Sequence, residues 1–148
     1  MMQAEDQRRV EDELSAWCHS YVEAFSAYDI PAIGSHWVFP ATLLIKSAPV
    51  ILKSREAFDA NTEKLCVFYR DQGVVRARRE LIAVLSMTPT TASIRVEDVM
   101  EDTTGAAIAT WQAGYTLTKT SNGWRACLAD AGGEIAAWAA RGTPLGSG

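Results

Sequence analysis

The sequence predicts an α+β fold in which three helices pack on a curved antiparallel sheet, forming a cone. Two observations lead to this fold class. Hydrophobic residues recur at helical spacing in the first part of the chain, and after Gly73 the hydrophobic period changes to two, which is typical of strands. With no internal repeat and no linker in the sequence, residues 1–148 are expected to form a single domain, with 141–148 as a flexible tail.

The helices are predicted from stripes and capping residues. The first is expected over residues 7–28, where one hydrophobic stripe comprises Leu14, Trp17, Cys18, Tyr21, Val22, Phe25 and Tyr28. Asp29 followed by Pro31 indicates the start of a second, shorter helix, with Ile33, His36 and Trp37 on its inner side and Pro40 at its end. Ser54 is a good N-cap for a third helix.

The strands are predicted from alternation and turns. Residues 41–53 read as a strand pair or a bent strand, interrupted at "KSAP" and unusually hydrophobic in "LLI". After Gly73, long segments that alternate in hydrophobicity are joined by the turns "SMTPTT", "EDTTG" and "TSNG", as in an antiparallel meander. The last segment, "EIAAWAAR", can form a short terminal helix.

Composition excludes several classes of function. The net charge of −4 and pI of about 5.2 argue against non-specific nucleic-acid binding. The N-terminus is polar where a signal peptide needs an apolar stretch, and no run of about 18 apolar residues predicts a membrane span. Cys18, Cys66 and Cys127 form no CxxC motif, so we expect neither disulfides nor a zinc site. These features favour a cytoplasmic protein without a metal or other cofactor.

Three stretches resemble the NTF2-like superfamily, in its SnoaL-like and ketosteroid-isomerase-like branch. They are "YVEAFSAYDIPAI" at 21–33, "SREAFDAN" at 54–61 and "TSNGWRACLAD" at 120–130, and the resemblance covers residues 10–131. It implies a cone that encloses a mostly apolar pocket between the first two helices, the first strand and the concave face of the sheet. These stretches specify a scaffold rather than a reaction.

The lining of the expected pocket is predicted from the resemblance at the first strand and from the aromatic residues expected to point inward. Ketosteroid-isomerase-like members carry a carboxylate base on the first strand, where this chain has Leu44 or Ile45, and neither side chain can take a proton. The pocket is therefore expected to bind an apolar small molecule. Its predicted lining is Trp17, Tyr21, Trp37, Phe39, Leu44, Phe58, Trp111 and Tyr115, most of which are also expected to serve as core.

Two alternatives with catalysis stay open. "RVE" places Arg95 and Glu97 on one strand face, and with Asp130 they resemble the Arg and two carboxylates of the superfamily's epoxide hydrolases. Glu stands where that pattern has Asp, and the water-holding tyrosine and amide are missing. His36 is the candidate acid or base of a dehydratase. The non-catalytic interpretation is that Arg95 and Glu97, and also "RARRE" at 76–80, form a solvated strand face.

A third alternative is an interaction module. The outer face of the sheet is expected to mix hydroxyl, amide and aliphatic side chains, which suits a moderately polar interface. We therefore expect a homodimer that pairs through the sheet face carrying Ile108, Thr110, Gln112, Thr116 and Thr118.

Overall fold

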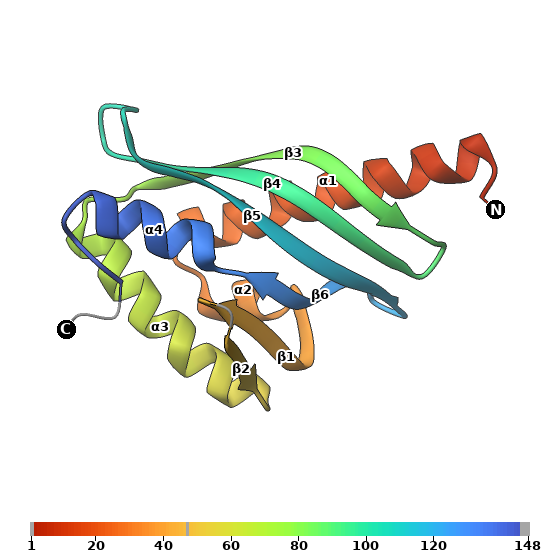
Figure 1. The fold of residues 1–148 in the computed structure, drawn as a ribbon, viewed down its shortest axis with the longest axis horizontal. Coiled ribbons are helices and arrows are strands. Elements are labelled where there is room, and N and C mark those ends of the chain that lie inside the picture. Colours follow the sequence, from red (N-terminus) through yellow and green to blue (C-terminus); the bar gives the residue numbers. More distant parts are fainter. Residues whose placement is uncertain (1, 47, 146–148) are drawn as a thin grey trace.

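The computed structural model describes residues 2–46 and 48–145 and confirms the α+β class and the predicted order of elements (Figure 1). Residue 47 of the expected "KSAP" interruption and residues 146–148 of the expected tail lie outside the described residues. The bounds are α1 Ala4–Ser26, α2 Ile30–Gly34, β1 Trp37–Ile45, β2 Ala48–Leu52, α3 Arg55–Asp71, β3 Arg76–Met87, β4 Thr91–Glu101, β5 Ala107–Thr120, β6 Gly123–Asp130 and α4 Gly132–Ala140.

The six strands form one curved, unclosed sheet in the order β2-β1-β6-β5-β4-β3 (Figure 1). Strands β3 to β6 form the predicted antiparallel meander. The sequence did not predict that β1, which pairs antiparallel with β2, also pairs parallel with β6. These two strands lie far apart in the chain, so no turn signal connects them.

The second helix is shorter than predicted. The Asp29 side chain caps α2 by accepting a backbone N–H at 3.2 Å, and the helix ends at Gly34. Trp37 already belongs to β1, and Pro40 lies within that strand, so the prediction that Pro40 ends the helix was wrong. The β1–β6 register is irregular between Trp37 and Thr42. Pro40, which has no N–H to donate, therefore lies where the ladder is interrupted.

α1 packs its hydrophobic stripe against the inner face of the sheet and lies along β3. Its buried residues are Val10, Leu14, Trp17, Cys18, Tyr21, Val22 and Ala24. Near its end, the Ser26 hydroxyl accepts the Ala77 N–H at 2.9 Å and so ties the helix to the edge strand β3. In the part of the chain that the structure describes, no helix is both long and apolar enough to cross a membrane.

α3 and α4 pack together beside the sheet (Figure 1). The Ser54 hydroxyl caps α3 as predicted by accepting a backbone N–H at 3.2 Å. In α4 the Trp138 side chain is fully buried, with its ring centroid 5.0 Å from that of Phe68 and 6.0 Å from that of Trp111. The terminal helix therefore adds an aromatic side chain to the core.

Candidate functional site

A buried ion pair lies on the inner face of the sheet. Arg79 on β3 and Asp98 on β4 are opposite each other in the strand register. Arg79 Nε donates to Asp98 Oδ1 at 2.6 Å and Nη2 donates to Oδ2 at 2.8 Å, while the two side chains are only 3% and 4% exposed. Burial lowers the pKa of Arg79, but Asp98 outweighs it and holds the pKa well above its ordinary value. Arg79 is therefore charged, and it meets Asp98 in a bidentate arrangement.

Aromatic rings surround the guanidinium of Arg79. Nη2 also donates to the Tyr115 hydroxyl at 2.9 Å. The guanidinium carbon lies 4.5 Å from the ring centroid of Tyr115, 5.0 Å from that of Tyr21 and 5.9 Å from that of Trp17. These distances fall within the range of cation–π attraction. The aromatic faces help to compensate for the removal of the cation from water.

One nitrogen of Arg79 lacks a strong acceptor. Nη1 is buried, and none of the described residues offers it an acceptor in good hydrogen-bond geometry. Arg79 lowers the pKa of the Cys18 thiol through its charge and a weak side-chain hydrogen bond, although burial has the larger effect and raises that pKa to about 11. A neutral thiol is a weak acceptor. Nη1 is thus a donor left without a strong acceptor, which costs free energy in a buried place.

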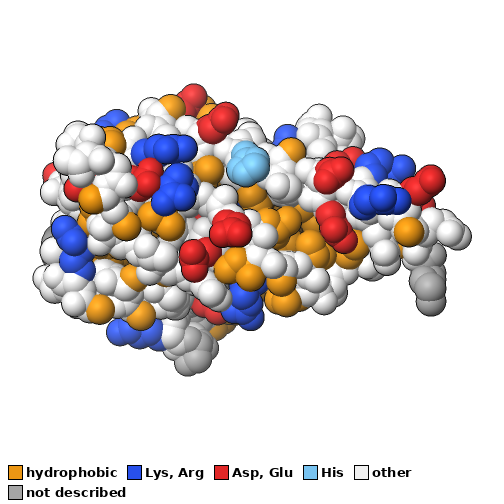
Figure 2. Space-filling view, turned by 90° about the horizontal axis from the view of Figure 1, so that it is seen from above, with side chains coloured by type: hydrophobic (Ala, Val, Ile, Leu, Met, Phe, Trp, Pro, Cys, Tyr) orange, Lys and Arg blue, Asp and Glu red, His pale blue; other side chains and the backbone are white. Residues whose placement is uncertain are grey.

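A groove of about 870 Å³ between α1 and β3 includes Arg79 in its lining. Its apolar lining includes Val22 of α1 and Ala77 of β3, and its charged lining includes Glu23 and Glu80. Figure 2 shows the molecule from above the view of Figure 1, with hydrophobic side chains exposed between groups of charged ones. The volume suits a small organic molecule.

His36 links two helices, and both of its ring nitrogens have protein partners. Nδ1 lies 2.7 Å from the Ala32 carbonyl oxygen, to which it donates, and Nε2 lies 2.8 Å from the Ser20 hydroxyl. Burial lowers the pKa of His36, which favours the neutral ring. This geometry explains His36 as a residue that joins α1 to α2, and it leaves no ring nitrogen free for a substrate.

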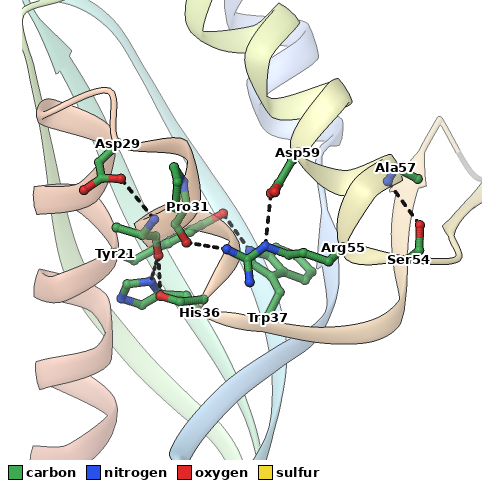
Figure 3. A network of polar contacts seen from close by, with 11 residues as sticks. Tyr21, Asp29, Pro31, His36, Trp37, Ser54, Arg55, Ala57 and Asp59 are labelled. Carbon is green, nitrogen blue, oxygen red and sulfur yellow. Dashed lines mark hydrogen bonds and ion pairs between the residues drawn. The ribbon is translucent and has the colours of Figure 1, made fainter.

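The same network fixes the other helices (Figure 3). Trp37 Nε1 donates to the Tyr21 hydroxyl at 2.9 Å, which ties β1 to α1. Arg55 of α3 binds Asp59 at 3.1 Å and donates to the Pro31 carbonyl oxygen at 2.5 Å, which ties α3 to α2. These contacts join β1 and α3 to the first two helices.

Seven of the eight predicted lining residues lie in the core or pack against it. Trp17, Tyr21 and Trp37 each lie within ring-contact distance of Tyr115, and Phe58 contacts both Trp37 and Phe39. Trp111 is buried and contacts Trp138.

Leu44 does not share this placement. In the register with β6, Leu44 lies beside exposed Asp130, whereas Leu43 lies beside buried Ala129 and packs on the core. Of the three residues in "LLI", only Leu43 packs against the core, and the buried residues of β1 are Trp37 and Ala41.

Arg95, Glu97 and Asp130 lie on the outer face of the sheet. Arg95 and Asp130 are exposed and flank Gly114 from opposite sides, and Glu97 lies opposite exposed Gln112. Asp130 accepts the Gly132 N–H at 2.9 Å at the start of α4. The set shares a face but no enclosed cavity, so it lacks the exclusion of water on which an activated water and a proton donor depend.

Sequence reasoning missed Arg79 and Asp98, although a signal was present. Alternation places Asp98 in the same phase as Ile94, Val96 and Met100, the buried residues of β4. The solvated face predicted for the "RARRE" cluster consists of Arg76, Arg78 and Glu80. Arg79 lies on the opposite face of the same strand, so that interpretation does not apply to it. A charged residue in a buried phase is the signal that could have found the pair.

A second polar cluster joins α4 to α3. The Tyr69 hydroxyl donates to the Glu134 carboxyl group, and Trp138 Nε1 donates to the same oxygen at 3.2 Å. Burial raises the pKa of Glu134 to about 7, against the lowering effect of these two hydrogen bonds. Glu134 therefore titrates near neutral pH. Among the described residues, no group of three or more His, Cys, Asp or Glu side chains could hold a metal ion.

The fold and this inner face place the chain among α+β proteins with a cone-shaped, cystatin-like architecture. The chain belongs to the NTF2-like family described as NTF2-like protein (DUF6841), whose model matches residues 12–133. α4 lies almost wholly beyond that match. No curated protein matches the chain significantly.

Solved structures support the fold. A ketosteroid isomerase-like protein from Erwinia carotovora atroseptica matches with a TM-score of 0.56 and 20% identity, over 78% of this chain and 88% of that one. An NTF2-like protein with a cystatin-like fold from Novosphingobium aromaticivorans matches with a TM-score of 0.63 and 19% identity, over 86% of this chain and 84% of that one. Aln2 from a Streptomyces species matches with a TM-score of 0.65 and 15% identity, over 88% of this chain and 91% of that one. At such identities the likeness concerns the fold alone.

Proposed function

We propose that this protein binds a small, ring-containing organic molecule in the groove between α1 and β3, with Arg79 as the donor that holds the ligand's polar end. Three of the aromatic side chains that the sequence predicts as pocket lining pack around the guanidinium of Arg79, and they are not among the residues that line this groove. The family comprises proteins of unknown function, so the proposal rests on the geometry of this chain.

The observation that carries the proposal is the unpartnered Nη1 of Arg79. A buried donor without an acceptor is destabilising by about 1–3 kcal/mol. A ligand oxygen that displaced the packing around Nη1 and accepted its N–H would remove that penalty. The groove reaches this residue and has apolar lining for a ring system.

The outer-face set is less well suited to a function of this kind. Arg95 and Asp130 are exposed, and a substrate bound there would remain in contact with water. This exposed arrangement gives no support to the hydrolase alternative. The dehydratase alternative loses support because His36 engages both ring nitrogens in contacts within the protein.

A thermal-shift screen tests the proposal. A panel of one- to three-ring aromatic compounds that each carry one oxygen acceptor is expected to contain members that raise the melting temperature, because a ligand that binds only the folded state stabilises it. The variant Arg79→Met/Asp98→Leu removes both charges together and should lose these shifts. Arg76→Met, at an exposed arginine of the same groove, is the matched control and should keep them. Shifts that persist in the double variant would refute the assignment.

A further inference from the structure

We propose that Asp98 sets the charge selectivity of this site: because it already neutralises Arg79, the site accepts an uncharged oxygen acceptor and rejects an anion. The inference rests on the proposed function and names the class of ligand, a ring compound with a neutral carbonyl oxygen such as that of a carboxamide.

The contacts of Arg79 explain why its charge is not available. Asp98 binds the guanidinium through two parallel hydrogen bonds of 2.6 and 2.8 Å, and both side chains are almost wholly removed from water. A bidentate pair of this kind is compensated within itself. What remains is a hydrogen-bond donor, Nη1, rather than a free positive charge, and since Nη1 is closed to solvent, a ligand reaches it only by displacing side chains around it.

The pKa values of Tyr115 and Cys18 also indicate that the charge of Arg79 is compensated. Tyr115 accepts a hydrogen bond from Arg79, yet burial raises the pKa of Tyr115 to about 12. Cys18 also lies near Arg79, and burial raises its pKa to about 11. An uncompensated guanidinium would favour the anionic forms of both groups. Here its attraction is smaller than the cost of burying a negative charge, and a ligand carboxylate at Nη1 would meet that same cost.

The rest of the groove offers an anion little compensation. The other two arginines of its lining, Arg76 and Arg78, both bind Glu101, at 3.6 and 2.8 Å. The lining also contains Glu23, Glu80 and Glu97. An anionic ligand would therefore approach several carboxylates, while the nearby cations already have partners.

A matched ligand series tests the inference on the unaltered protein. The probes are 2-naphthamide, which is neutral and has an acceptor; 2-naphthoate, which is anionic; and 2-methylnaphthalene, which has no acceptor. Dissociation constants are measured at pH 7.5 by two-dimensional amide NMR, which suits a 16.1 kDa protein and weak ligands. We expect 2-naphthamide to bind at least tenfold more tightly than 2-naphthoate and more tightly than 2-methylnaphthalene.

The outcomes separate this inference from the proposed function. Tighter binding of 2-naphthoate overturns the charge selectivity and leaves the proposed function standing. Equal binding of 2-methylnaphthalene and 2-naphthamide overturns the role of Nη1 as donor. If none of the three binds, and the thermal-shift panel also shows no ligand, the proposed function fails and this inference fails with it.

Asp98→Asn tests the cause directly. The amide keeps one acceptor for Arg79 but removes the negative charge, so the preference should reverse, with 2-naphthoate binding more tightly than 2-naphthamide. Glu56→Gln is the control, because it removes an exposed carboxylate of α3 that lies outside the groove lining, and it should leave the preference unchanged. A folded Asp98→Asn with the wild-type preference refutes Asp98 as the determinant. Should that variant not fold, the wild-type series decides alone.

Discussion

Gly133 lies against the backbone of Gln112: a Cβ at position 133 would be 2.3 Å from the Gln112 carbonyl oxygen. No side chain can be accommodated at that distance unless a strand or a helix moves. This contact lets the first turn of α4 approach β5 beyond the end of β6, and it places Trp138 in the core.

Gly133→Ala should therefore destabilise the protein by about 2–3 kcal/mol, the upper part of the range for overpacking a well-packed core. The neighbouring Gly132→Ala is the control. Its Cβ would lie 3.2 Å from the Asp130 carboxylate, the end of a side chain that can move, so we expect a change within about 1 kcal/mol. Chemical denaturation measures both. Equal stability of the two variants would show that α4 is not held by this contact.

Replacing Arg79 and Asp98 together should destabilise the protein less than replacing Asp98 alone. Asp98→Leu alone leaves Arg79 buried without its carboxylate and should cost about 3–5 kcal/mol. Arg79→Met/Asp98→Leu replaces both charges by apolar groups and should remain within about 2 kcal/mol of the wild type. Urea denaturation of both variants provides the comparison. A double variant as unstable as the single one would mean that Arg79 has a structural role beyond the pair.

Glu134 should make the stability depend on pH. Its pKa is about 7 in the folded protein and near 4.5 when it is free, so the folded state binds more protons between these values. The contribution of Glu134 is therefore fully present below about pH 4.5 and is lost as pH rises through 7, with a total on the order of 2–3 kcal/mol.

The measurement for Glu134 is a difference between two proteins. The buried His36 has a lowered pKa, so its contribution changes in the opposite direction, rising with pH through its own titration. Subtracting the stability of Glu134→Gln from that of the wild type at each pH removes the effect of His36. A difference that stays flat between pH 4.5 and 7.5 would contradict the role of Glu134.

Dimerisation through the outer face of the sheet stays a prediction. Thr110 and Gln112 are exposed there, as a moderately polar interface requires. Light scattering at micromolar concentration should give twice 16.1 kDa, and Thr110→Lys should shift the value toward the monomer. A monomer mass for the wild type would exclude this dimer, as would a dimer unaffected by the lysine.

Local patterns in the sequence determined most of the secondary structure. The hydrophobic stripe of residues 14–28 predicts α1, because the interior can bury only one face of an amphipathic helix. Asp29 and Ser54 predict two helix starts, and both cap their helices as expected. The alternating segments after Gly73 predict the meander. The sequence motifs of this scaffold also identify the family that its model confirms.

Only the tertiary structure decided which polar groups meet inside. Arg79 and Asp98 are separated by a turn, and neither is favourable in a buried phase by itself. Their burial becomes tolerable because β3 and β4 pair in the register that places one opposite the other. Glu134 reaches the interior because Gly133 lets α4 approach β5, and β1 joins β6 across most of the chain. Such contacts depend on distant segments, which no local periodicity encodes.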